Sequence, residues 1–311
     1  MIKKNMIKNC CSFCNLNTQF IRQYKYKNSI FSKMNIFLCA NCSLYYSFPN
    51  PSNKSLGYYY NNSPEVSIGS PNSGKINIAF ANLLAKIRVK FIIENLQVYN
   101  RINILEFGSG YGHLAKEFFN TNKVRNYYSI ETDKRCFEIL KKMNIKIYSK
   151  FNNIKNSLIK FDLLILSHVL EHIQDPINFI KEINHNYKIP YIFVDVPCED
   201  FKYKEFDEPH LFFYNKFSLE KLFNLCGYDV EKISYFGEDI TLIKDNSSLF
   251  TKLINKLNLY TEYLFLFFLK KNINLNMTIL EFLMNKKFKA NNSNIRKARW
   301  IRCLLKSKNV N

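Results

Sequence analysis

The chain has 311 residues, enough for one medium catalytic domain with small additional units, and its 47% apolar and 16% aromatic residues exclude a chain that is disordered throughout. The net charge of +20 lies at the two ends, since residues 1–60 carry 8 Lys and Arg without an acid and residues 245–311 carry 13 against 3. Residues 61–244 have 24 basic against 22 acidic residues. An enzyme of nucleic acid more often carries a basic face on its catalytic domain, so we do not expect a nucleic-acid partner.

The apolar segments and the cysteines predict the cellular location. Residues 1–9 are polar and basic and no apolar segment follows them, so no secretion signal is expected. The longest apolar run, residues 263–269, is far shorter than the roughly 20 residues that span a bilayer. Nine cysteines without a secretion signal favour a reducing compartment, with metal ligation over disulfides. We therefore expect a cytoplasmic protein.

Two cysteine pairs mark the first unit, residues 1–51. Cys11 and Cys14 enclose two residues, as do Cys39 and Cys42, and 24 residues separate the two pairs. Each pair can place two thiolates on one tight turn, and two such turns close a tetrahedron around Zn²⁺. Cys10 could take the place of Cys11. Because four thiolates leave no open coordination position, the expected zinc is structural.

From residue 52 onward the pattern changes to helices and then to alternating strands and helices. A turn-rich linker at 61–74 and a helix at 76–98 form a connecting unit, residues 52–98. Residues 99–244 predict strands at 102–107, 127–131, 145–148, 161–167, 191–196, 228–235 and 240–243, and helices at 114–119, 134–143, 177–186 and 218–226. Such alternation indicates an α/β domain with a parallel sheet.

The last unit, residues 245–311, combines apolar clusters with many basic residues, and we expect it to be mostly helical. One interpretation is an amphipathic element that contacts an anionic membrane surface. The other is a helical cap on the α/β domain with a solvated basic face. We favour the cap, because most amphipathic helices bury their apolar side against a core.

Glycines stand at alternate positions after the strand at 102–107: Gly108, Gly110 and Gly112, preceded by the acid Glu106. Ligands of open α/β sheets bind outside the carboxyl ends of the strands. Glycine lets the backbone approach such a ligand without a Cβ in the way. A dinucleotide site would have the pattern G-x-G-x-x-G, but His113 stands where its third glycine would be.

This segment resembles the first motif of the class I S-adenosylmethionine-dependent methyltransferases, E/D-x-G-x-G-x-G. The resemblance implies a Rossmann-like seven-stranded sheet and S-adenosyl-L-methionine as the cofactor. It also implies that Glu131, which ends the second strand, binds the ribose hydroxyls, a geometry that suits an ionised carboxylate. The implied cofactor-binding residues are Glu106, Gly108, Ser109, Gly110, Gly112, Glu131, Asn152 at the adenine edge and Ser167 at the methionine end.

Residues 161–176 resemble the F-D-hydrophobic-S-x-x-L-E-H-x-x-D-P stretch of a large methyltransferase subgroup. Together with the cysteine pairs and the segment 208–213, the layout is similar to the front two-thirds of the zinc-containing sugar-nucleotide C-methyltransferases. The similarity covers residues 10–243, whereas those enzymes carry a further α/β domain in place of residues 245–311. It implies a small acceptor, a sugar or a precursor of a surface polysaccharide.

Three histidines are candidates for the base that takes a proton from a hydroxyl or an acidic carbon of the acceptor. We place His210 first, because it resembles the substrate-side histidine of the sugar enzymes and has Glu208 nearby to orient it. His172 and His168 follow. For His172, a packing or helix-capping role is an equal alternative.

Other functions stay open at this level. A lipid or quinone-like acceptor at the membrane would suit the basic tail, zinc modules also precede RNA base methyltransferases, and a cofactor-binding scaffold without catalysis is the alternative outside the enzymes. The tyrosines at 58–60 could form a lid over the acceptor, although packing of the zinc module onto the core is the favoured interpretation.

Overall fold

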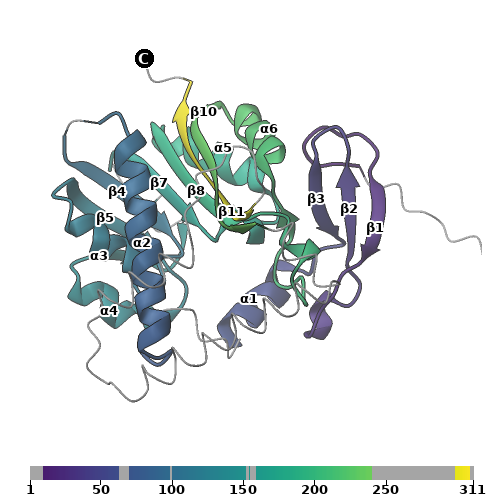
Figure 1. Cartoon of the computed structure of the whole chain (residues 1–311), viewed down its shortest axis with the longest axis horizontal. Helices are drawn as coiled ribbons and strands as arrows, with labels where there is room; N and C mark the ends of the chain where they lie inside the picture. The colour runs from purple at the N-terminus through teal and green to yellow at the C-terminus, as the bar shows by residue number, and fades with distance from the viewer. Residues whose placement is uncertain are drawn as a thin grey trace, which may run out of the picture.

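The computed structural model describes residues 10–62, 70–98, 100–151, 154, 159–239 and 298–308, and these residues form two sheets (Figure 1). The larger sheet has seven strands in the order β10-β11-β8-β7-β4-β5-β6. Its strands are β4 (Ile102–Phe107), β5 (Val124–Ile130), β6 (Lys146–Tyr148), β7 (Leu163–Ser167), β8 (Tyr191–Pro197), β10 (Tyr228–Asp239) and β11 (Ala298–Ser307). The expected α/β fold with a seven-stranded sheet is confirmed, but the sheet is mixed and not wholly parallel as predicted.

Neighbouring strands from β6 to β8 run parallel, whereas β11 is antiparallel to both of its neighbours. Side chains alternate between two cores, as the pleat of a strand requires. On β7, for example, Leu163 and Ile165 belong to one core and Leu164 and Leu166 to the other. The sequence of a strand that is buried on both faces is a continuous apolar run, and β7 was predicted from such a run.

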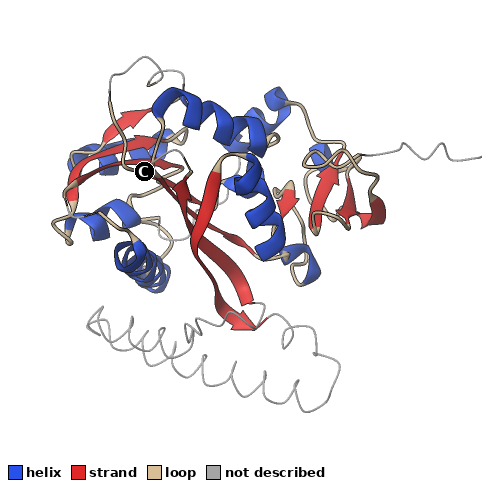
Figure 2. Ribbon diagram, turned by 90° about the horizontal axis from the view of Figure 1, so that it is seen from above, coloured by secondary structure: helices blue, strands red, loops and turns tan. Residues whose placement is uncertain are grey.

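Helices cover both faces of this sheet (Figure 2). Buried residues of α2 (Lys75–Asn95), α3 (His113–Phe119) and α4 (Phe137–Lys142) pack in one core. Buried residues of α5 (Pro176–Tyr187) and α6 (Lys216–Leu225) pack in the other. The two cores therefore hold the sheet between two helical layers, and no described helix has the length and apolarity to cross a bilayer.

The strand β11 corrects the expected helical tail. Residues 298–307 were predicted as part of a basic helical extension, but they insert between β8 and β10. Leu304 and Leu305 are fully buried on opposite faces of the sheet. Arg302, one of the basic residues that suggested a solvated surface, is only 2% exposed. Its guanidinium lies over the ring of Phe236, 4.0 Å from the ring centre. The predicted strand at 240–243 and the rest of the tail, residues 245–297, lie outside the described residues.

The smaller sheet joins the cysteine-bearing unit to the α/β domain. Its order is β1 (Gln19–Gln23), β2 (Asn35–Cys39), β3 (Leu44–Phe48) and β9 (Phe212–Phe213), so the last strand comes from a distant part of the chain. The side chains of both units share one hydrophobic core. The expected boundary at residue 51 therefore separates segments that fold against each other.

A buried ion pair reinforces this junction. Asp207, which is fully buried, accepts two hydrogen bonds of 2.7 Å from the guanidinium of Arg22 and one of 2.6 Å from the backbone of Lys25.

The segment that connects the two units begins with a helix that was not predicted, α1 (Asn53–Asn62). The three tyrosines of this helix face different surroundings.

Replacing Asp207 should therefore weaken the whole fold. In Asp207→Ala the lost charge-assisted bonds and the unpaired, partly buried guanidinium should lower the free energy of unfolding by about 2–3 kcal/mol. Urea unfolding measures this loss. The exposed ion-pair residue Asp229 gives the matched control, and Asp229→Ala should change the unfolding free energy by less than about 0.5 kcal/mol. Equal stability of the two variants would contradict a structural role for the Arg22–Asp207 pair.

Candidate active site and cysteine cluster

Four cysteines meet at one end of the small sheet. One sulfur from each of Cys11, Cys14, Cys39 and Cys42 lies within 4.8 Å of the others, and the sulfurs of Cys14 and Cys39 are 3.5 Å apart. Cys10 is exposed and lies outside this group, so Cys11 is the cluster member. Burial raises the pKa of Cys11 to about 12, so a bound cation would be needed to keep this thiol ionised at neutral pH. The donor set fits a closed tetrahedral Zn²⁺ site.

The glycine turn after β4 leaves backbone facing open space. Gly108, Gly110 and Gly112 all have positive φ, at 65°, 52° and 74°. A Cβ on Gly108 would lie 3.1 Å from Val169, whereas a Cβ on Gly110 would have no atom within 4 Å. The turn therefore packs against the loop that follows β7, and at Gly110 it offers the unobstructed backbone that a cofactor needs.

Glu131 lies beside this turn. Its carboxylate accepts hydrogen bonds from the N–H groups of Gly110 (2.8 Å), Thr132 (2.7 Å) and Asp133 (2.8 Å). Three bonds leave about one of a carboxylate's four acceptor positions free. The sequence prediction that the glycine turn and the acid of the second strand come together thus corresponds to a direct contact. These residues fit S-adenosylmethionine, with open backbone at Gly110 and an anchored acid next to it.

Glu106 has a different environment. Its side chain is 1% exposed and accepts a hydrogen bond of 2.7 Å from the hydroxyl of Tyr127. Burial raises the pKa of Glu106 to about 7, and the Tyr127 bond offsets only part of that effect. Ser109, also buried, lies with its hydroxyl 2.6 Å from that of Ser129. Asn152, predicted at the adenine edge, lies outside the described residues.

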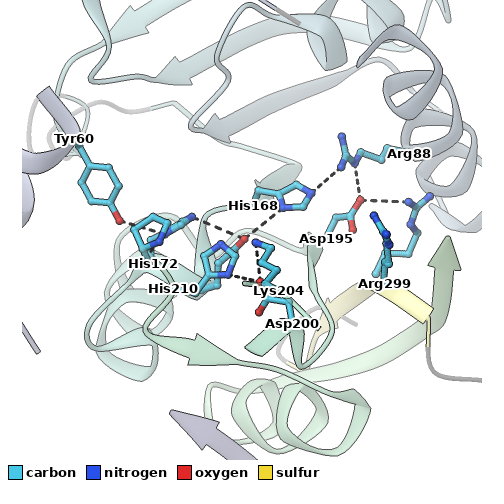
Figure 3. A network of polar contacts seen from close by, with 12 residues as sticks. Tyr60, Arg88, His168, His172, Asp195, Asp200, Lys204, His210 and Arg299 are labelled. Carbon is cyan, nitrogen blue, oxygen red and sulfur yellow. Dashed lines mark hydrogen bonds and ion pairs between the residues drawn. The ribbon is translucent and has the colours of Figure 1, made fainter. Parts of the chain in front are cut away.

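A polar network runs along the carboxyl ends of β7 and β8 (Figure 3). Ser167 ends β7 opposite Asp195, and His168 follows with a φ of 55°. Nε2 of His168 is 2.9 Å from the guanidinium of Arg88, which also donates a hydrogen bond of 2.5 Å to Asp195. Arg302 reaches the same carboxylate oxygen at 3.3 Å.

The network continues to the other two predicted histidines. Nδ1 of His168 is 3.4 Å from the carboxylate of Glu171, and Nε2 of His172 is 3.9 Å from the same oxygen. The rings of His172 and His210 are 4.9 Å apart. Burial lowers the pKa of His172 to about 4, so this ring is neutral at pH 7. The structure thus brings His168, His172 and His210 together around one buried carboxylate.

The residue that orients His210 is Asp200, which corrects the expected role of Glu208. Nδ1 of His210 is 2.8 Å from Asp200, and Lys204 is 2.8 Å from the same carboxylate. Burial opposes ionisation of Asp200, but His210 and Lys204 outweigh it and hold its pKa well below the usual range. Glu208 instead accepts hydrogen bonds from the backbone of Lys27 and Asn28. It therefore fixes a loop of the cysteine-bearing unit.

Sequence reasoning missed most charged residues of this network, among them Arg88, Asp195 and Asp200. None of these three stands in a recognisable motif. Asp195 lies near the end of a predicted strand, beside Ser167 on the neighbouring strand, and that position is a signal that could have found it. The tyrosines of α1 divide between the two expected roles. Tyr59 packs edge-on against Phe31, with ring centres 5.2 Å apart, whereas the hydroxyl of Tyr60 is 3.2 Å from Nδ1 of His172.

Residues 81–233, which include the glycine turn, Glu131 and the histidine network, match the family described as a methyltransferase domain. The chain is an S-adenosylmethionine-dependent methyltransferase. No curated protein matches the sequence of this methyltransferase.

Solved methyltransferase structures are similar to this enzyme at low identity. A SAM-dependent methyltransferase from Archaeoglobus fulgidus is 15% identical with a TM-score of 0.46, over 73% of this chain and 94% of that chain. An S-adenosylmethionine-dependent methyltransferase from Clostridium acetobutylicum is 10% identical with a TM-score of 0.43, over 82% and 98%. Magnesium protoporphyrin IX methyltransferase from Synechocystis, solved with bound SAH, is 10% identical with a TM-score of 0.43, over 58% and 92%.

Elemental analysis should find about one zinc ion per chain of the methyltransferase. Cys39→Ser should lose this zinc, because three thiolates bind it far more weakly than four. Cys10→Ser is the matched control and should keep the metal, since Cys10 lies outside the cluster. Zinc retained in Cys39→Ser, or lost in Cys10→Ser, would show that the four-cysteine assignment is wrong.

The raised pKa of Glu106 predicts a pH dependence of stability. The folded protein holds the Glu106 proton up to about pH 7, whereas an unfolded chain releases it near the ordinary value of 4.5. Stability from this group is therefore present at low pH and is lost as the pH rises to about 7. Relative to Glu106→Gln, the wild type should lose about 2 kcal/mol of unfolding free energy between pH 5 and pH 8.

Urea unfolding of both proteins at the two pH values measures this difference. The exposed residue Glu94 supplies the control, and Glu94→Gln should follow the wild type at both pH values. A pH-independent difference between the wild type and Glu106→Gln would mean that Glu106 is ionised throughout the range.

Proposed function

We propose that the enzyme methylates an oxygen or an acidic carbon of a small polar acceptor, a sugar or a precursor of a surface glycan. The observation that carries this proposal is the network of three histidines and buried carboxylates at the carboxyl ends of β7 and β8. It lies close to the glycine turn, because a Cβ placed on Gly108 would be 3.1 Å from Val169, which stands between His168 and Glu171 in the sequence. An acceptor hydroxyl or acidic carbon loses a proton during transfer, and groups of this kind can take that proton.

The cofactor, when bound, supplies an electrophilic methyl group on a sulfonium. We assign Gly108, Gly110 and Gly112 to the backbone surface that holds it, with Glu131 on the ribose hydroxyls and Ser167 near the methionine end. Glu131 is already fixed by three backbone N–H groups, so little freedom is lost when it binds a hydroxyl. Transfer is an in-line displacement, and the main task of these residues is alignment.

His210 is our first choice for the residue that contacts the reacting group of the acceptor, with His172 and His168 beside it. Asp200 holds Nδ1 of His210, which fixes the ring and leaves Nε2 available. An acceptor hydroxyl at that nitrogen would be held by a ring that cannot rotate. A hydroxyl-rich sugar matches the polar character of this surface better than a lipid.

The alternative of a lipid acceptor at the membrane rested on the basic tail, of which residues 245–297 lie outside the described residues. One basic residue of that tail, Arg302, is buried in the sheet. Its charge faces Asp195 instead of a membrane surface.

The proposal is tested by measuring S-adenosylhomocysteine release with panels of sugar nucleotides, glycan fragments, quinone-like phenols and RNA. A sugar-linked acceptor should be methylated fastest, and turnover confined to phenols or RNA would refute the proposed acceptor class. Calorimetry should show cofactor binding that Gly110→Arg abolishes, because the new side chain fills the space next to Glu131.

Gly227→Arg is the control for this variant. Gly227 also has a positive φ, and a Cβ placed on it would have no atom closer than 3.9 Å. It precedes β10, an edge strand that is separated from β4 by three other strands. Cofactor binding that survives Gly110→Arg, or that is lost equally in Gly227→Arg, would contradict our assignment of the glycine turn.

A further inference from the structure

Glu171 is a buried carboxylate with weak polar contacts. Its side chain is 1% exposed, and among the described residues neither oxygen has a hydrogen-bond partner of good geometry. The nearest group is Nδ1 of His168, which lies 3.4 Å from one oxygen, at the limit of hydrogen-bond distance. Leaving a buried charge unsatisfied costs several kcal/mol, so its presence calls for a ligand. The role of His210 as a proton acceptor does not account for Glu171.

Two imidazoles face this carboxylate, and both are held from behind. Nδ1 of His210 donates to Asp200 at 2.8 Å. Nδ1 of His172 is 3.4 Å from the carbonyl oxygen of Pro209 and 3.2 Å from the hydroxyl of Tyr60. In the tautomer in which Nδ1 donates to that carbonyl, the lone pair is on Nε2, as it is in His210. Outer contacts of this kind, to a carboxylate and to a backbone carbonyl, are those that orient metal-binding histidines in proteins.

We propose that Glu171, His172 and His210 hold a divalent metal ion. One ligand atom from each lies within 4.8 Å of the others. Figure 3 labels two of the three residues, His172 and His210. Nitrogen and oxygen ligands about 2.1 Å from one ion lie up to about 4.2 Å apart, so the cluster needs to contract only slightly. The two nitrogens and one carboxylate suit a first-row ion such as Mn²⁺, Fe²⁺, Co²⁺ or Zn²⁺.

This site differs from the cysteine cluster in what it can do. Four thiolates close a coordination sphere, whereas three protein ligands leave positions open for other oxygens. The hydroxyls of a sugar could fill those positions, and this part of the inference rests on the proposed function. A hydroxyl bound to the ion loses its proton to water more readily, and the resulting oxygen takes the methyl group as the carbon–sulfur bond of the cofactor breaks. Nε2 of His210 then serves as a ligand, in place of accepting the proton.

The charges around the cluster are compatible with an added cation. Of the nearby cations, Arg88 pairs with Asp195 and Lys204 with Asp200. Among the described residues, Glu171 has histidine neighbours but no arginine or lysine partner, and it would be the anion that the metal neutralises. Tyr60 contributes a further oxygen on the α1 side, where its hydroxyl contacts Nδ1 of His172.

Mn²⁺ binding, followed by electron paramagnetic resonance on the full chain after mild treatment with a chelator, tests the proposal. The wild type should bind one Mn²⁺ at this site while elemental analysis still finds the cysteine-bound zinc. Glu171→Gln and His210→Ala should each weaken Mn²⁺ binding at least tenfold. His185→Ala, which changes an exposed histidine of α5, is the control and should bind as the wild type does.

Calorimetry with S-adenosylmethionine shows whether each variant is folded. If Glu171→Gln does not fold, His172→Asn serves as a second variant of a proposed metal ligand. A wild type that does not bind Mn²⁺, or a folded Glu171→Gln that binds it as tightly, would overturn the proposal. Sugar methylation that proceeds unchanged in chelator would refute the metal site alone. Mn²⁺ binding without turnover of any sugar would support the metal site and refute the proposed acceptor class.

Discussion

One buried carboxylate, Asp195, joins the parts of the catalytic domain. It lies on β8 and receives Arg88 from α2 and Arg302 from β11, while its backbone carbonyl accepts a hydrogen bond from His168. A carboxylate with no solvent exposure is tolerable only when cations accompany it, so the positions of α2 and β11 are fixed by the charge that they must neutralise. The same contacts hold His168 in its left-handed conformation at the edge of the active site.

How much of this could be read from the sequence depends on how local each feature is. The strand β4, the glycine turn and Glu131 follow from short segments whose glycine spacing and apolar runs decide their conformation, and the structure has all three in contact. The strand β11 could not be read in this way, because Arg302 looks like a surface residue until Asp195, more than a hundred positions away, is known to face it. Asp200 was missed because the sequence does not show which of several nearby acids faces His210, and Glu208 was favoured only because it stands closest to His210 in the sequence.

The cysteine-bearing unit is more than an appendage of the catalytic domain. Strand β9 pairs with β3, and it follows His210 by only two positions. The hydroxyl of Tyr24 donates to the carbonyl oxygen of His210 itself. A zinc ion held by the four cysteines would therefore support the backbone that carries an active-site histidine, although its sulfur ligands take no part in the chemistry. The structural metal site and the reaction centre are therefore linked through the short pairing of β3 with β9.

The place of β11 in the sheet has a consequence for synthesis on the ribosome. Strand β8 is complete at residue 197, but the neighbour that pairs with it begins only at residue 298. During translation of the intervening residues, the backbone groups of β8 on that edge have no partner strand, and Asp195 lacks one of its two cations. Exposed strand edges of this kind invite pairing with other chains, so the growing polypeptide passes through an interval in which it depends on protection from aggregation.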